Sequence, residues 1–440
     1  MKAHARVFLL VAAGFSLAAP ARAADAPAAV AVGADAGLGV LGTDFYANVA
    51  GFLAYDAQPL RFGAQLPLKF MLTGTDGVGL RRQDWDEPGD FTRILRFLDW
   101  KPNSQWHLRL GEPVAVTLGN GAIVDHFYNA TDLDHYKTSL RLAWHNDQWG
   151  AEIFANDVVR WEILAARAHF RPLGGTTSRE RDLEIGLTLA TDRLVPVTPA
   201  GPIDAVDQPT ALRNRLFLYD FDVNVPLWRG MQRQLSLTLD LVGLHHLSTY
   251  FGETLELTGG AHAGLKLQIP IAASELTVRL ETTYAGHGYT PGYLDDVYEV
   301  ERFQLQSAHN DSRLGKLAWL QAQTGSPLGV RARLEWRDEK SVPVTVLAGW
   351  QGREGTSLHL WLATREMAGV TLRAHWGQQH VQVADDLPVI SKTSALLEVR
   401  YRLAPALSVS LQSGTRWQAK DDGYAARLEV LGMARLEWRR

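Results

Sequence analysis

The chain has 440 residues, with 14 tryptophans, no cysteine and a formal net charge of −4. The lack of cysteine excludes disulfide bonds, a thiolate metal site and a cysteine nucleophile. The mild charge gives no reason to expect nucleic acid as a partner. After residue 23, no stretch approaches the roughly 20 consecutive apolar residues that a membrane helix needs, which excludes a helical membrane protein.

Residues 1–23 have the features of a secretory signal peptide. A basic start with Lys2 and Arg6 precedes an apolar run and an alanine-arginine-alanine cleavage site. The sequence therefore predicts export, and export without disulfides is typical of a bacterial envelope protein. Residues 24–43 are rich in alanine and glycine, show no stable period and are predicted to form a flexible lead-in.

From residue 44 onward, apolar and polar side chains alternate with a period of two. In the hairpin predicted over residues 136–157, Leu142 and Trp144 have one parity, whereas Arg141 and His145 have the other. This period predicts strands with one apolar and one polar face. A soluble sandwich would bury the apolar face, whereas a membrane barrel turns it to lipid and encloses the polar face around a wet lumen.

Aromatic placement favours the membrane barrel. Tryptophans stand near the ends of predicted strands, as in the girdles at membrane interfaces: Trp100, Trp106, Trp144, Trp149, Trp336, Trp350, Trp376 and Trp438. We predict an all-β protein, a transmembrane antiparallel up-and-down β-barrel of about 18 strands, within a range of roughly 16 to 20. Residues 44–440 form its single domain, in the outer membrane of a Gram-negative bacterium.

Three stretches carry a family resemblance: residues 90–100, 110–142 and 152–173. Together they resemble an uncharacterised family of bacterial outer-membrane β-barrel proteins, and more distantly alginate-export-type barrels and porins. The resemblance implies a barrel and brings no catalytic residues with it. The outward apolar face implies outer-membrane lipid as a partner. The alternating last strand up to Trp438 implies the barrel-assembly machinery as another, although Arg439 and Arg440 after the terminal aromatic depart from the usual pattern.

The connection at residues 113–135 is predicted to fold into the lumen and constrict it. The residues proposed for this constriction are glycines that permit a tight path and polar residues that follow them: Gly119, Gly121, Asp125, Asn129, Asp132 and Asp134. Their oxygens are of the kind that bind calcium, but the spacing is not that of an EF-hand. A hydrogen-bonded polar loop is the favoured interpretation, so no metal and no cofactor are predicted.

The polar parity of the strands places an excess of arginine over acid in the predicted lumen. The residues predicted to contact a solute are Arg109, Arg141, Arg167, Arg171, Arg279, Arg331, Arg333, Arg373, Arg400 and Arg402. Such a lining favours anionic solutes. The alternative is that arginine and glutamate form cross-strand ladders that fill and stiffen the barrel, and the sequence leaves both interpretations open.

Two functions remain in view, and a third is disfavoured. The first is an outer-membrane channel or exporter for an anionic solute or polysaccharide, and the second is a non-transport structural or envelope-machinery barrel with a plugged lumen. A barrel enzyme would need a nucleophile, a histidine base and an orienting group. Ser139 and His145 share a parity, but no third group can be placed beside them, so no enzyme is predicted.

Overall fold

The computed structural model of the protein describes residues 30–73, 77–86, 88–112, 115–129, 137–172, 183–196, 213–230, 233–247, 257–271, 274–286, 288–301, 316–317, 320, 326–338, 344–352, 355–364, 366–381, 393–420 and 423–439. The predicted signal peptide, residues 1–23, lies outside this part of the chain, as do Asp132 and Asp134.

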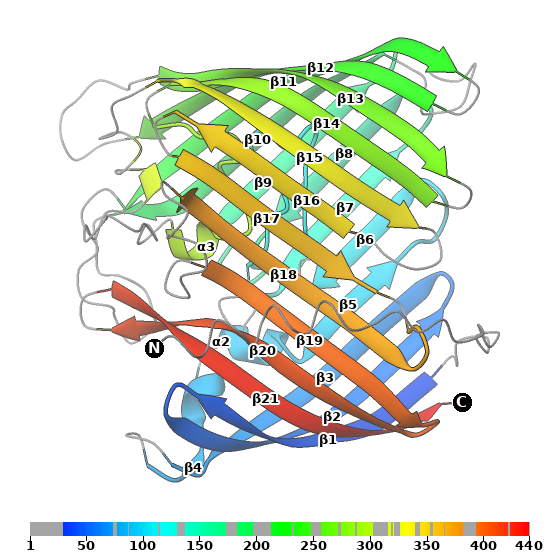
Figure 1. Cartoon of the computed structure of the whole chain (residues 1–440), viewed down its shortest axis with the longest axis vertical. Helices are drawn as coiled ribbons and strands as arrows, with labels where there is room; N and C mark the ends of the chain where they lie inside the picture. The colour runs from blue at the N-terminus through cyan, green and yellow to red at the C-terminus, as the bar shows by residue number, and fades with distance from the viewer. Residues whose placement is uncertain are drawn as a thin grey trace.

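The described strands form one 21-stranded antiparallel sheet that closes on itself (Figure 1). In chain order they are β1 (Val30–Leu41), β2 (Asp44–Ala57), β3 (Leu60–Met71), β4 (Gly79–Leu80), β5 (Leu95–Trp100), β6 (Trp106–Gly111), β7 (Ser139–His145), β8 (Trp149–Ala155), β9 (Ile163–Phe170), β10 (Glu184–Pro196), β11 (Arg213–Gly230), β12 (Arg233–Leu247), β13 (Leu257–Ile271), β14 (Ser274–Ala285), β15 (Leu328–Asp338), β16 (Val344–Gln351), β17 (Gly355–Ala363), β18 (Val370–Val381), β19 (Thr393–Ala404), β20 (Leu407–Lys420) and β21 (Gly423–Arg439). The short β4 pairs with β3 but is not part of the closed wall, which the remaining 20 strands form.

Closure comes from β1, which pairs with β2 on one side and with β21 on the other. The predicted barrel is confirmed, but the estimate of about 18 strands is too low, because several connections are only two residues long and leave room for more strands. The lead-in predicted for residues 24–43 is also wrong from Val30 onward, since this stretch is the first strand of the wall.

Glycine hides the alternation of β1 in the sequence. Gly33 and Gly39 occupy lumen-facing positions at which the aromatic rings of β2 need the space. A Cβ atom on Gly39 would lie 2.3 Å from the Tyr46 ring, and one on Gly33 would lie 2.6 Å from the Phe52 ring. Because glycines stand where this face would carry polar side chains, β1 does not show the usual alternation.

The predicted inversion of the two faces is confirmed. Leu38 and Leu241 are exposed on the outer surface, whereas Asp35 and Asp240 from the opposite parity are buried. Among the predicted girdle residues, those exposed near strand ends are Trp100, Trp106, Trp149, Trp350 and Trp438. The outer surface is therefore an apolar belt suited to lipid, and the chain is an outer-membrane β-barrel. Among the described residues, no helix is long and apolar enough to span a bilayer.

The connections differ in length at the two ends of the barrel. At the end that holds the last residues of β21, the connections 58–59, 231–232, 272–273 and 405–406 have two residues each. The opposite end carries much longer connections, including 112–138 and 286–327. Outer-membrane barrels have short periplasmic turns and longer extracellular loops, so the long connections face the outside of the cell.

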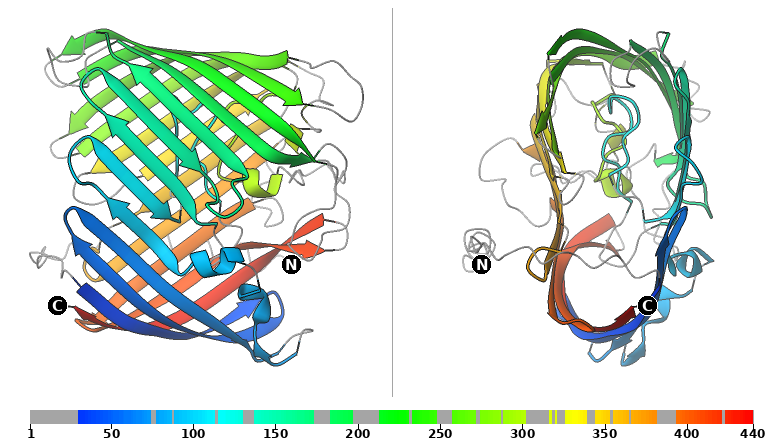
Figure 2. Two further views of the ribbon diagram at one scale, coloured as in Figure 1. Left: turned by 180° about the vertical axis from the view of Figure 1, so that it is seen from behind. Right: turned by 90° about the vertical axis from the view of Figure 1, so that its right-hand side faces the viewer.

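Two segments from the long-connection end enter the barrel, and we call them together the plug: residues 115–129, and residues 288–301 with the short helix α3 (Tyr298–Glu301). Figure 2 shows both inside the ring of strands, which has an oval outline. Backbone hydrogen bonds join them, from Leu294 N to Ile123 O at 2.8 Å and from Asp125 N to Leu294 O at 3.0 Å. Outside the plug, the β3–β5 connection holds β4, the turn η1 (Arg82–Asp84) and α2 (Pro88–Thr92).

Candidate functional site: the lumen

Four predicted lumen arginines lie around the plug and are deeply buried. Arg167, Arg279, Arg331 and Arg333 have side chains only 4%, 8%, 9% and 8% exposed. Wall carboxylates pair with them: Arg167 with Asp222 (2.7 Å) and Glu184 (3.0 Å), Arg279 with Asp240 (3.5 Å), and Arg331 with Glu281 (3.1 Å). For this group, the charge-ladder interpretation describes the structure.

Arg171 and Arg402 also have carboxylate partners. Arg171 pairs with Glu184 at 2.6 Å, which extends the ladder on β9 and β10. Arg402 forms an ion pair with Glu366, which belongs to the connection between β17 and β18 at the short-connection end. Arg171 therefore lies on the wall and Arg402 lies near the mouth at the short-connection end, both away from the plug.

The predicted constriction does fold into the lumen, through its first half. Gly119 and Gly121 have φ values of 57° and 80°, which favour glycine, and a Cβ atom on Gly121 would lie 2.9 Å from an Asp125 oxygen. Asn129 does not turn toward Asp125. Its amide donates to the carbonyls of Lys137 at 2.8 Å and Asn156 at 2.6 Å, which pins the end of the segment to the wall.

Asp125 is the main ionic contact between the plug and β15. Its Oδ2 accepts from Arg331 at 2.6 Å and also from Arg333, while His126 Nδ1 lies 2.8 Å from its Oδ1. Burial alone would raise the pKa of this carboxyl, but Arg333, His126 and Arg331 outweigh it and hold the pKa well below its usual range. Asp125 is thus an anion held by two guanidinium groups.

A second ionic contact joins the other plug segment to β17 and β18. Asp296 lies 2.9 Å from His359 Nδ1 and 2.6 Å from His375 Nε2. Trp361 stacks on His126 with 4.3 Å between ring centroids and on His359 with 5.4 Å. The sequence analysis did not identify Asp296 or Trp361, because their roles depend on contacts between distant segments. The sequence did contain one signal for this contact: His359 and Trp361 have the same parity, so their side chains lie on the same face of the strand.

Five arginines form a second group that is more accessible, which we call the arginine arc: Arg96, Arg109, Arg141, Arg373 and Arg400. The side chains of Arg96, Arg141, Arg373 and Arg400 are 26%, 34%, 36% and 33% exposed. The carboxylates paired with them are more deeply placed, at 12% for Glu112, 19% for Glu152 and 10% for Glu398. Guanidinium groups therefore form the accessible surface of this group.

Arg109 and Arg96 have distinct places in the arc. Arg109 lies directly opposite Arg141 in the β6–β7 register and has no ion-pair partner among the described residues. Arg96 was not predicted, because it has the parity of the outer face. It is the extra residue where the β3–β5 register shifts, and it pairs with Glu112 at 3.0 Å.

Ser139 and His145 are not brought together. They are the first and last residues of the extended strand β7, so about 20 Å separates them along it. The Ser139 hydroxyl donates to the Gly111 carbonyl at 2.8 Å. This pair therefore lacks the contact between nucleophile and base that hydrolysis would need.

A closed sheet, an apolar outer belt and a charged lumen with an inserted plug define the class as an outer-membrane β-barrel. No protein-family model and no curated protein sequence matches this chain. The chain is similar in structure to the outer-membrane protein OprD from Pseudomonas aeruginosa, with 11% identity, a TM-score of 0.32, and 93% of this chain and 94% of that chain covered.

Two further structures show a similar degree of likeness. A loop-deletion mutant of OmpT, an outer-membrane protein of Vibrio cholerae, has 10% identity and a TM-score of 0.28, with 93% of this chain and 98% of that chain covered. A mutant of the ferric enterobactin receptor from Pseudomonas aeruginosa has 9% identity and a TM-score of 0.33, with 94% and 82% covered. With TM-scores this low, none of these likenesses carries an argument about function.

Proposed function

We propose that the protein is an outer-membrane channel or exporter for an anionic solute or polysaccharide. The arginine arc carries the proposal, because its guanidinium groups are accessible from the lumen while their paired carboxylates are deeper. Arg109 adds a cation without an ion-pair partner among the described residues. A lumen lined in this way attracts anions and repels cations.

The test is ion selectivity in planar lipid bilayers. Purified full-length protein under a potassium chloride gradient should give a reversal potential of the sign expected for chloride preference. A second preparation that lacks residues 115–129 should conduct more, because that segment occupies part of the lumen. If neither preparation forms a pore, the channel proposal is wrong.

The plug favours a second candidate function, a non-transport structural or envelope-machinery barrel. Its side chains Ile123, Val124, Phe127 and Leu294 are fully buried against one another and the wall. A tightly packed plug of this kind closes part of the lumen in this structure. Co-purification of a stoichiometric periplasmic protein, together with absence of conductance, would support this function over the channel.

A further inference from the structure

The plug contacts opposite sides of the barrel through different chemistry. Toward β8–β12 it packs mainly through apolar side chains, with Phe127 against Phe154 at a centroid distance of 5.4 Å. The polar contacts on that side are donated by neutral plug side chains, from Asn120 to Asp240 at 3.0 Å and from Tyr298 to Asp192 at 2.9 Å. Toward β15–β18 it is held by Asp125 and Asp296, through arginine and histidine. The polar side is therefore the one at which a charged solute can compete with the plug's own contacts.

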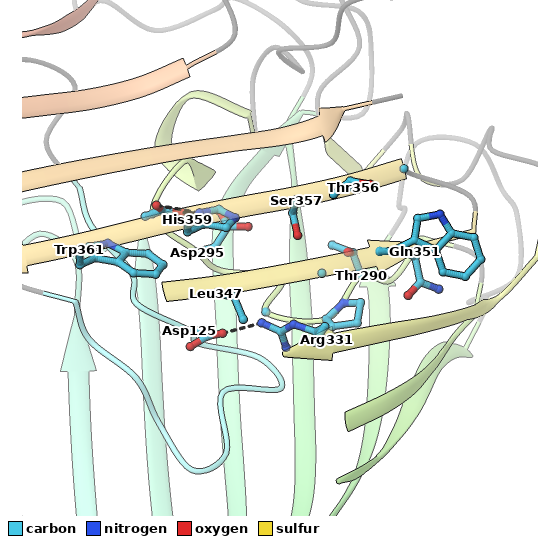
Figure 3. Close-up of a pocket in the computed structure, with 16 residues that line it drawn as sticks. Asp125, Thr290, Asp295, Arg331, Leu347, Gln351, Thr356, Ser357, His359 and Trp361 are labelled. Carbon is cyan, nitrogen blue, oxygen red and sulfur yellow. Dashed lines mark hydrogen bonds and ion pairs between the residues drawn. The ribbon is translucent and has the colours of Figure 1, made fainter. Parts of the chain in front are cut away.

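A pocket lies on this polar side, between residues 290–296 of the plug and β15–β17 (Figure 3). Its cavity volume is about 50 Å³, and it opens to solvent. Figure 3 shows the ion pair of Asp125 with Arg331 at its edge, and Ser357 and Thr290 facing the same space. Trp361 also lines it, and its indole N–H has no hydrogen-bond partner in the described part of the chain.

We propose that Arg331 and Arg333 are a binding site for the carboxylate of a hydroxylated anionic solute, and that Asp125 occupies this site as an internal substitute. The proposal rests on the proposed function and names the site at which the anion displaces the plug. The two arginines are two residues apart on the lumen face of β15, and both bind the same oxygen of Asp125.

Exchange of one carboxylate for another leaves the charge bound at the two arginines unchanged. Arg331 keeps Glu281 at 3.1 Å and Arg333 keeps Glu335 at 3.6 Å when Asp125 leaves. An incoming carboxylate then replaces the same charge-assisted hydrogen bonds. The solute's hydroxyl groups find donors and acceptors in Ser357, Thr290 and the Trp361 indole. Loss of the Asp125 contact frees one edge of the plug from β15.

The experiment measures binding of sodium gluconate, with sorbitol as its neutral match, to full-length protein in detergent micelles by calorimetry. Asp125→Asn removes the internal competitor, so gluconate should bind about tenfold more tightly than to the wild type. The double variant R331Q/R333Q should not bind gluconate, and sorbitol should bind to none of them. Equal affinity of wild type and D125N, or equal binding of sorbitol, would overturn the proposal.

Two further variants keep the test interpretable. His126→Ala leaves both arginines and Asp125 in place but removes the imidazole 2.8 Å from Asp125, so gluconate affinity should rise by a smaller factor even if D125N folds poorly. Glu429→Gln alters a buried carboxylate that accepts from Lys69 and Tyr46 elsewhere in the lumen, and should leave gluconate affinity unchanged. A rise in E429Q as large as in D125N would count against the site.

Binding and conduction separate the two proposals. If gluconate binds as expected but reconstituted protein conducts no anions, the channel proposal fails and the site stands. If the protein conducts anions but D125N and H126A bind gluconate no better than the wild type, the site fails and the channel proposal stands.

Discussion

The carboxylate of Glu112 joins opposite walls of the barrel, because it lies 3.5 Å from the guanidinium of Arg373 although the two residues are 261 positions apart. Arg96, on β5, binds the same carboxylate. Glu398, on β19, lies 3.6 Å from Arg373. Three residues of the arginine arc, Arg96, Arg373 and Arg400, are therefore joined through Glu112 and Glu398 in one network across the lumen. Its charge acts on any ion that passes this level of the barrel.

Arg373→Gln should weaken anion selectivity. Of the four arc arginines whose side-chain exposure is given above, Arg373 is the most exposed. Its substitution also leaves Glu112 and Glu398 with one cation fewer. We expect the ratio of chloride to potassium permeability to fall by a factor of about two or more. Reversal potentials in planar bilayers measure it. Arg81→Gln, which breaks an ion pair with Asp84 in the β3–β5 connection, should leave the ratio unchanged; a similar fall there would contradict a specific role for Arg373.

The sequence was sufficient for the barrel because the period of two is a local property of each strand. Alternation of Arg141 and Leu142 defines both faces without any knowledge of the neighbouring strands. It was insufficient for β1, where glycine makes room for rings that belong to β2. Local pattern therefore predicted the wall wherever a strand carries side chains on both of its faces.

The functional state of each arginine could not be predicted from parity. Arg331 and Arg373 both face the lumen, but Arg331 is buried by Asp125, which lies 206 positions away in the chain. Arg373 keeps 36% of its side chain exposed, although Tyr128 at the end of the first plug segment donates to its partner Glu112 at 2.9 Å. Only the path of the inserted segments separates the two groups, and that path depends on contacts between distant residues.

Leu241→Arg should destabilise the protein in a bilayer. Leu241 is exposed on the outer face near the middle of β12, where lipid chains replace water. Arginine near the midplane of a barrel costs about 2–4 kcal/mol, and near an interface about 0–1 kcal/mol. Urea unfolding in lipid vesicles measures the difference. Leu403→Arg, next to the end of β19, is the matched change and should cost much less. Equal losses would contradict the placement of Leu241 near the bilayer midplane and of Leu403 near an interface.

Gly39→Ala should destabilise the closure of the barrel. The new methyl group would meet the Tyr46 ring, whose hydroxyl donates to Glu429 at 2.6 Å. Displacing the ring would disturb this buried bond, and we expect a loss of about 1–3 kcal/mol in the free energy of unfolding. Gly51→Ala on β2 is the control, since nothing lies within 4 Å of its Cβ position. A neutral G39A variant would show that Tyr46 moves aside without cost.

The contact between the plug and β15 should be insensitive to pH until strongly acidic conditions. The pKa of Asp125 is held well below its usual range, so its contribution to stability is fully present above the unfolded pKa of about 3.9 and is lost as pH falls toward the folded value. Hydrogen exchange in residues 115–129 should therefore show constant protection from neutral pH to mildly acidic pH, and lower protection below it. In Asp125→Asn this acid-dependent loss should be absent. Loss of protection already between neutral and mildly acidic pH would contradict the assignment of this contact to a carboxyl with a strongly lowered pKa.

A cross-link between the two plug segments should hold the lumen closed. Val124 and Leu294 are bridge partners and both are fully buried, with Cα atoms about 5 Å apart, a separation that a disulfide can span. In the proposed exchange, an anion that displaces Asp125 lets residues 115–129 move away from β15, while Asp296 keeps the other segment on β17 and β18. The segments must then part, so oxidised V124C/L294C should conduct severalfold less than the same protein after reduction. The natural chain has no cysteine, and the single variant V124C controls for the reductant. Equal conductance in the oxidised and reduced forms would mean that the plug moves as one body or does not move at all.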